Sequence, residues 1–466
     1  MLKQKITLIG LAAALALTQL QTAGWAGEAA PPAGSLSFEE VYQKILAYYP
    51  RLKSQKARAE EAVAEKFEAY AALFPKVEGL SSVTTGDDPV YVFGSHLRQE
   101  KFADGNFALS SLNSPRHRTN FSFALQGEMP LFNAFQTISR IRSARFLSKA
   151  EARWETLTAM EASLLSVEGY LKGLLARDNL RRVREVEDAA QKDLRQADEL
   201  KDKGMVLGAD FYAAKMILAE IRQMNISLAA GEKTSRILLN ILMGAPAEWN
   251  YSLSGDIPEN SGESGPLQDW LRAAHEARPD LTALELKAEA LRVEVFREKM
   301  SALPRVGAFG TVSEDSHDLR TGGENFIMGV KSTVTVLDAG YWARRKKARA
   351  AYKAILEDVQ ALKDQVSKDI AQAVNGLAAV TANIPVAEEG YQAAGEAVKQ
   401  TEVLYREGKK SIADLLEIRR AFLSAAFKRN ELLFQQEMAR ANLLFLSGRL
   451  DEKALDELGQ RIGGEA

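Results

Sequence analysis

Apolar residues recur at steps of three and four along two long stretches of the chain. An apolar seam of this kind on an otherwise charged helix predicts a coiled coil. We expect one long helix over about 134–203 and a second over about 341–407. A helix of about 70 residues is about 100 Å long. The seam positions are Leu157, Met160, Leu164, Val167, Leu171 and Leu174 in the first stretch and Ile355, Val359, Leu362 and Val366 in the second.

Shorter helical stretches flank the long ones. They are Ser37–Phe74, Ala209–Met243, Leu267–Leu303 and Ile412–Ser447. Proline ends the first and third of them because it cannot continue the helical hydrogen-bond ladder. Gly244 and Gly448 are the expected stops of the other two. Ser35 or Ser37 is expected to cap the first stretch, and Pro385 predicts a kink in the second long helix.

Alternating polarity between the helices predicts strands. The apolar positions are Phe121, Phe123, Leu125 and Met129 in one copy and Phe326, Met328, Val330, Val334 and Val336 in the other. Strands of about 9–11 residues with one apolar face suit a transmembrane barrel, although a soluble sheet covered on one face has the same pattern. Four strands cannot close a barrel, since the smallest bacterial ones have about eight. In lipid, where open strand edges are not tolerated, the chain would have to oligomerise.

The series of elements occurs twice. An offset of 229 residues relates Pro50 to Pro279, and an offset of 204 relates Asp210 to Asp414. Two nearly constant offsets indicate a duplication with one length change. The difference of 25 residues falls in the polar loop 86–118 of the first hairpin. In that loop, Phe93, Phe102 and Phe107 are expected to pack on each other rather than form an interfacial girdle.

The composition of the chain argues against several classes of function. A formal net charge of −2 gives no basic footprint for nucleic acid. The absence of cysteine excludes disulfides, thiolate metal sites and cysteine nucleophiles. The histidines have no zinc or triad spacing, and no phosphate-binding glycine loop occurs. We therefore expect a protein that is not an enzyme and has no catalytic residue, cofactor or metal. The histidines are His96, His117, His275 and His317.

The N-terminus has the pattern of a secretory signal. Lys3 and Lys5 precede an apolar run over 6–17, and small residues follow as far as Ala26. A run of this length is too short to span a bilayer of about 30 Å as a helix. The expected organisation is a signal peptide over 1–26, a first repeat over 27–244 with a hairpin at about 76–130, a linker over 245–266, a second repeat over 267–448 with a hairpin at about 305–337, and a C-terminal tail over 449–466.

The duplicated helix–strand–strand–helix unit resembles the TolC family of outer-membrane channels. The segments that carry the likeness are PLFNA at 130–134, VLDAG at 336–340 and LYREGKKSIADLL at 404–416. The resemblance covers nearly the whole mature chain. It implies an α+β membrane protein, a homotrimer whose twelve-stranded β-barrel continues into a long α-helical coiled-coil periplasmic tunnel. It also implies a mixed α/β equatorial belt, formed by the linker and the tail.

The same resemblance implies a function and partners. The chain would be the outer-membrane channel of a tripartite efflux pump or a type I secretion system. It would sit in outer-membrane lipid and give passive exit to substrates. A periplasmic adaptor protein and an inner-membrane pump, proton-driven or of ABC type, would deliver those substrates.

The resemblance assigns candidate site residues to the two turns that follow the long helices. Acids there are also commonly capping or solvated groups, and glycine there also simply permits a tight turn. Lys410 stands where the family example has arginine, and Ala209 where it often has threonine or serine. The implied periplasmic gate comprises Asp210, Tyr405, Lys410, Asp414 and Glu417, and the implied adaptor-docking turns comprise Gly204, Met205, Leu207, Gly408 and Ser411.

A periplasmic coiled-coil adaptor or scaffold protein is the alternative interpretation. It would account for the signal peptide and the apolar seams. It would not account for alternating strands at matching positions of both copies, so the channel is the favoured hypothesis.

Overall fold

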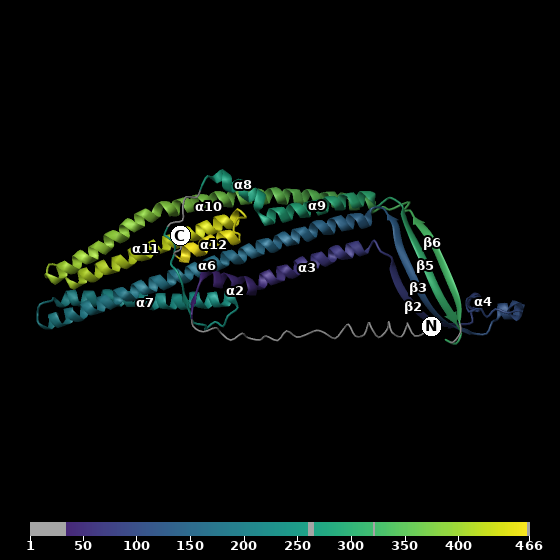
Figure 1. The fold of residues 1–466 in the computed structure, drawn as a ribbon, viewed down its shortest axis with the longest axis horizontal. Helices are drawn as coiled ribbons and strands as arrows, with labels where there is room; N and C mark the ends of the chain where they lie inside the picture. Colours follow the sequence, from purple (N-terminus) through teal and green to yellow (C-terminus); the bar gives the residue numbers. More distant parts are fainter. Residues whose placement is uncertain (1–33, 260–264, 320–321, 464–466) are drawn as a thin grey trace.

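The computed structural model describes residues 34–259, 265–319 and 322–463. The expected signal peptide therefore lies outside the described residues. Long helices run along the molecule, and a sheet stands at one end of them (Figure 1). The long helices are α6 (Gln136–Asp202), α7 (Gly208–Met243), α10 (Tyr341–Arg406) and α11 (Ile412–Leu446). The bounds of α6 and α10 lie within about two residues of the predicted ones.

The predicted seams are buried as expected. Met160, Val167, Leu171 and Leu174 of α6 lie in one apolar cluster, and Val366 of α10 lies in another. Gly244 and Gly448 end α7 and α11 with φ of +69° and +73°, in the left-handed conformation that helix stops favour. The helix α10 continues past Pro385 without interruption. The kink stays a prediction.

The two helices that precede the hairpins were each predicted as one piece, and this was wrong. Each is split before its proline, into α2 (Phe38–Tyr48) and α3 (Pro50–Ala71), and into α8 (Leu267–Ala277) and α9 (Pro279–Met300). Tyr49 and Arg278 have ψ of 110° and 121°. A residue that precedes proline is pushed out of the helical region by the proline ring, and this explains both breaks. Ser37 caps α2 through a capping box with Glu40, as predicted.

The sheet has the order β2–β3–β5–β6, with every neighbouring pair antiparallel. Its strands are β2 (Lys76–Gly86), β3 (Arg118–Asn133), β5 (Arg305–Ser316) and β6 (Gly322–Thr333). Strand β6 ends at Thr333, where its partner β5 begins at Arg305. Val334 and Val336 were predicted in this strand, and they lie beyond it because no partner strand remains to pair with them.

The register gives the sheet one apolar and one polar face. Residues that are paired across strands share a face, and in this register Leu125 is level with Val312, which pairs with Phe326. All three side chains are exposed in the single chain. The opposite face carries the polar residues Ser82, Thr84, Ser122, Gln126, Thr311, Ser313, Asp315 and Asn325. The outer edges of β2 and β6 have no strand beside them among the described residues.

The long loop of the first hairpin is folded rather than irregular. It contains α4 (Pro89–Arg98), the 3₁₀ helix η1 (Asp104–Phe107) and α5 (Leu109–Asn113). The ring centroid of Phe102 lies 5.0 Å from those of Phe93 and Phe107, so the predicted packing within the loop is confirmed. Gln99 donates to Asn120, and Asn120 donates to Asp315 on the polar face of the sheet. The loop therefore rests on the polar face at the hairpin end.

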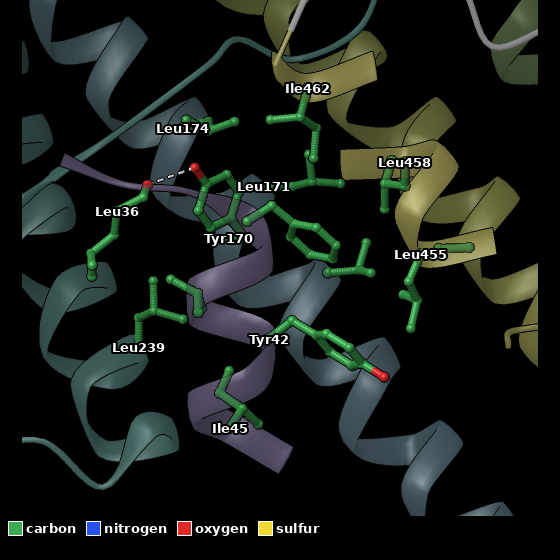
Figure 2. Close-up of a cluster of buried hydrophobic side chains, with 14 of the residues drawn as sticks. Leu36, Tyr42, Ile45, Tyr170, Leu171, Leu174, Leu239, Leu455, Leu458 and Ile462 are labelled. Atoms are coloured by element: carbon green, nitrogen blue, oxygen red, sulfur yellow. Dashed lines mark hydrogen bonds between the residues drawn. The ribbon is translucent and has the colours of Figure 1, made fainter. Parts of the chain in front are cut away.

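A smaller layer, which we call the belt, lies on the middle of the long helices. It consists of α2, α8, β1 (Ser35–Leu36), β4 (Ser252–Leu253) and α12 (Glu452–Gly463), and β1 pairs with β4 in parallel. Figure 2 shows Tyr170 of α6 at its centre, beside Leu36 and Tyr42. The Tyr170 hydroxyl lies 2.9 Å from the Leu36 carbonyl oxygen and 2.7 Å from that of Ser254. The belt thus joins segments from both repeats and the C-terminus.

One described helix, α10, is long and apolar enough over part of its length to cross a membrane by composition alone. This criterion is also met by helices that pack in bundles. The seam of α10 packs against α8, α9 and α11, but only 17% of the apolar window is buried in the single chain. Packing within the chain therefore accounts for only a small part of its apolar residues.

Candidate functional site at the helical tip

The candidate site residues gather at the end of the molecule that is far from the sheet. The turn between α6 and α7 and the turn between α10 and α11 both lie there (Figure 1). Gly204 and Gly408 have φ of +76° and +70°, a conformation that glycine adopts without strain. Each turn is closed by the same pair of backbone hydrogen bonds. The N–H of Gly204 donates to the carbonyl of Lys201, and that of Met205 donates to Leu200. In the second turn, Gly408 donates to Tyr405 and Lys409 donates to Leu404. The requirement for a tight turn therefore explains both glycines.

The first turn presents apolar side chains to solvent. Met205 and Leu207 are each 72% exposed. In the second turn, Ser411 caps α11 by accepting from the backbone N–H of Asp414. An exposed apolar pair beside a polar capped turn is a surface on which another protein could pack.

Asp414 is a capping residue in this chain. Its Oδ2 accepts from the backbone N–H of Ser411 at 3.1 Å, which completes a capping box. The Nζ of Lys410 lies 3.8 Å from the same oxygen. The hydrogen bond from the Ser411 backbone is the main reason that the pKa of Asp414 is lowered, and Lys410 adds to the effect. Asp414 therefore stays ionised at the tip.

Glu417 is linked to the helix beside it through an arginine. It accepts from Arg420 at 2.6 Å, and Arg420 also donates to Glu220 of α7 at 2.9 Å. These three side chains are 37–50% exposed, so the ion pairs add little to the stability of the fold. Their main effect is to orient the side chains of Glu417, Arg420 and Glu220. The link joins the two repeats across the tip.

Asp210 and Tyr405 are not joined to each other in the chain. Asp210 lies in the first turn of α7 and forms no hydrogen bond or ion pair among the described residues. The Tyr405 hydroxyl is buried, yet it has no hydrogen-bond partner within the described ranges. Burial raises the pKa of Tyr405, and the nearby carboxylate of Asp193 adds to this rise. A buried hydroxyl without a partner calls for a group from outside the chain, or a water molecule.

A buried charged cluster lies behind Tyr405, and sequence reasoning missed it. Arg419 of α11 is 8% exposed. Its Nη2 lies 2.8 Å from Oδ2 of Asp193 on α6 and 3.0 Å from Oε1 of Glu402 on α10. Burial raises the pKa of Asp193, and Arg419 opposes that rise. The available signal was an arginine at a seam position of α11, between Leu416 and Leu423.

The sequence and fold of this chain match known proteins. Residues 270–449 match the model of the family described as Outer membrane efflux protein. The second half of the chain is therefore an outer membrane efflux protein domain. No curated protein matches the sequence significantly. The resemblance inferred from the sequence is confirmed over this segment, which is 180 of the 466 residues, and the match supports an outer-membrane location.

Solved outer-membrane channels share the fold. The structure of the CmeC outer membrane channel of Campylobacter jejuni is 16% identical, with a TM-score of 0.76, over 91% of this chain and 89% of that one. The outer-membrane channel OprN is 19% identical, with a TM-score of 0.73, over 88% and 89%. The outer membrane protein VceC of Vibrio cholerae is 16% identical, with a TM-score of 0.71, over 88% and 96%. At these identities the likeness concerns the fold.

Proposed function

We propose that the chain forms the outer-membrane channel of a tripartite efflux pump or a type I secretion system. The observation that carries this proposal is the four-stranded sheet, with one apolar face, one polar face and two free edges. In lipid both edges must be paired. The free β2 edge of one copy pairs with the free β6 edge of the next, and three copies close a twelve-stranded barrel with its polar face inward.

The helices continue this passage across the periplasm, and no energy source is needed in the channel itself. An inner-membrane transporter drives the substrate, and a periplasmic adaptor couples the two proteins. Our candidate surface for the adaptor is formed by the two turns at the helical tip, with the exposed Met205 and Leu207 in one and with Gly408 and Ser411 in the other.

Disulfide cross-linking tests the barrel. The chain has no cysteine, so each new bond reports only the introduced pair. Ser82→Cys on β2 is combined with single cysteines at each position from 323 to 331 on β6. We expect covalent trimers at one position, with at most weak bonding two residues away from it, because a disulfide needs Cα atoms within about 7 Å and alternate residues share a face. Ser122→Cys on β3 replaces Ser82→Cys as the control, since both neighbours of β3 are in the same chain. Absence of intermolecular bonds in every register would contradict the closed barrel.

A gate at the tip is the second part of the proposal. The unpartnered Tyr405 hydroxyl and the ionised Asp414 supply a donor and a charge for contacts between neighbouring copies. Tyr405→Phe combined with Asp414→Ala should raise the single-channel conductance severalfold in planar bilayers. The matched control is Tyr352→Phe with Asp358→Ala, far from the tip on α10. Equal conductance of the gate variant and the unchanged protein would remove these residues from the gate.

A further inference from the structure

Both long helices begin with basic residues and no acidic ones. The first acidic residues of α6 and α10 are Glu151 and Glu357. Three basic positions in each helix have the spacing i, i+3 and i+7, which places them on one face. The same offset of 204 residues relates them, so both repeats carry the feature. We call these residues the basic stripe: Arg142, Arg145 and Lys149 on α6, and Lys346, Arg349 and Lys353 on α10.

The basic stripe is exposed and has no partner among the described residues. The arginines just before it behave differently, since Arg140 pairs with Glu68 and Arg344 pairs with Asp338. Within the single chain α6 already has α3 on one side and α9 on the other (Figure 1). The neighbouring helices of α6 are therefore already in place, and they supply no carboxylate that pairs with its stripe residues.

The direction of the stripe follows from the heptad phase of the long helices. Three heptads beyond Lys149 comes Tyr170, and three heptads beyond Lys346 comes Ser367. Tyr170 contacts the belt at Leu36, and the Ser367 hydroxyl lies 3.3 Å from Nε2 of His275 on α8. The stripe thus faces the side that the belt covers. In a ring of helices around an open passage, an additional layer such as the belt lies on the outside. Because the stripe faces the same side as the belt, it also points outward.

The position of the stripe along the helix is close to the lipid boundary. Arg142 lies six residues, or about 9 Å, after the start of α6. Lys149 lies about 20 Å from the same starting point. Apolar side chains are exposed just before α10, with Val336 at 94% and Leu337 at 89%. Trp342 follows them, and tryptophan is typical of membrane–water interfaces.

We propose that the basic stripe binds the anionic headgroups of phospholipids in the periplasmic leaflet of the outer membrane. The inference rests on the proposed barrel, which sets the outward direction. Basic residues within about a Debye length of an anionic surface add to membrane binding, and of the α6 stripe Arg142 lies nearest to that boundary. The stripe holds the channel at a fixed depth, because its charges engage headgroups while the apolar sheet face engages acyl chains.

Lipid binding to the full-length protein in detergent tests this inference. Short-chain phosphatidylglycerol and phosphatidylcholine are titrated, and bound lipid is measured by native mass spectrometry. Changing Arg142, Arg145 and Lys149 to Gln should weaken phosphatidylglycerol binding on the order of tenfold and leave phosphatidylcholine binding unchanged. The matched control changes Arg184, Lys192 and Arg195 to Gln, three exposed basic residues nearer the tip of α6.

Conductance of the same preparations separates the outcomes. Unaltered phosphatidylglycerol binding by the stripe variant, with pores intact, overturns the lipid site and leaves the channel standing. A shift in reversal potential without loss of lipid also overturns it, because the stripe would then line the passage. Absence of pores from the unchanged protein overturns the proposed function and the outward direction with it.

Discussion

Arg419→Met should strongly destabilise the tip. The change removes the buried cation that the partly buried carboxylates of Asp193 and Glu402 share, with Nη2 contacts of 2.8 and 3.0 Å. A buried charge that loses its partner costs about 3–5 kcal/mol, and the partial exposure of Glu402 favours the lower end. We expect a clear fall in the apparent Tm of the purified protein. Because the cluster joins α6, α10 and α11 behind Tyr405, conductance should also rise.

The neighbouring arginine is the matched control. Arg420 also contacts two carboxylates, those of Glu220 and Glu417, but its side chain is 37% exposed against 10% for Arg419. Exposed ion pairs contribute about 0–1 kcal/mol. Arg420→Met should therefore leave the apparent Tm nearly unchanged. An equal fall in both variants would contradict the role given to the buried cluster.

The Arg419→Met deficit should shrink as the pH is lowered. Burial already raises the pKa of Asp193, and the variant loses the cation that opposes this rise. A carboxyl group with a raised pKa binds its proton more firmly in the folded state than in the unfolded one. Stability relative to the unchanged protein is therefore regained as the pH falls through the folded-state pKa. A deficit that is constant with pH would show that packing, not charge, causes it.

Tyr170→Ala should detach the belt from the long helices. The Tyr170 side chain is fully buried, and its ring packs edge-on against Phe38 with 5.6 Å between centroids. Truncating a buried aromatic side chain costs about 3–5 kcal/mol. Trypsin should then cleave the belt faster, and the apparent Tm of the purified protein should fall.

Tyr170→Phe separates the ring from the hydroxyl. It keeps the packing and removes only the contacts with the Leu36 and Ser254 carbonyl oxygens, at a cost of about 1–2 kcal/mol. Its fall in Tm should be well below that of Tyr170→Ala. Equal falls would mean that the hydroxyl, rather than apolar packing, holds the belt.

The long helices could be predicted from the sequence because their apolar period is local. Positions such as Val167 and Val366 repeat within each turn of helix and need no tertiary information. Pro50 is also a local signal for the break at Tyr49, although the helical pattern on both sides of it favours one continuous helix. The helix α4 was missed, although Asp88 and Pro89 form a good start signal, because polar residues dominate the surrounding loop.

The candidate site was less accessible to sequence reasoning. Motif positions pointed to Tyr405 and Asp414, and the capping role of Asp414 was recognised as an alternative. The cluster of Asp193, Glu402 and Arg419 could not be assembled, because Asp193 lies 226 residues from Arg419 in sequence. Only the packing of three helices brings the charges together. The Tyr405 hydroxyl is a second example, because its burial without a hydrogen-bond partner among the described residues can be seen only in the folded chain.

Single-channel recording in planar lipid bilayers tests the central claim most directly. The protein purified from outer membranes should insert and produce uniform conductance steps, small while the tip is closed and larger after the change of Tyr405 and Asp414. A protein that is found wholly in the soluble periplasmic fraction and gives no steps would contradict the channel and favour an adaptor or scaffold.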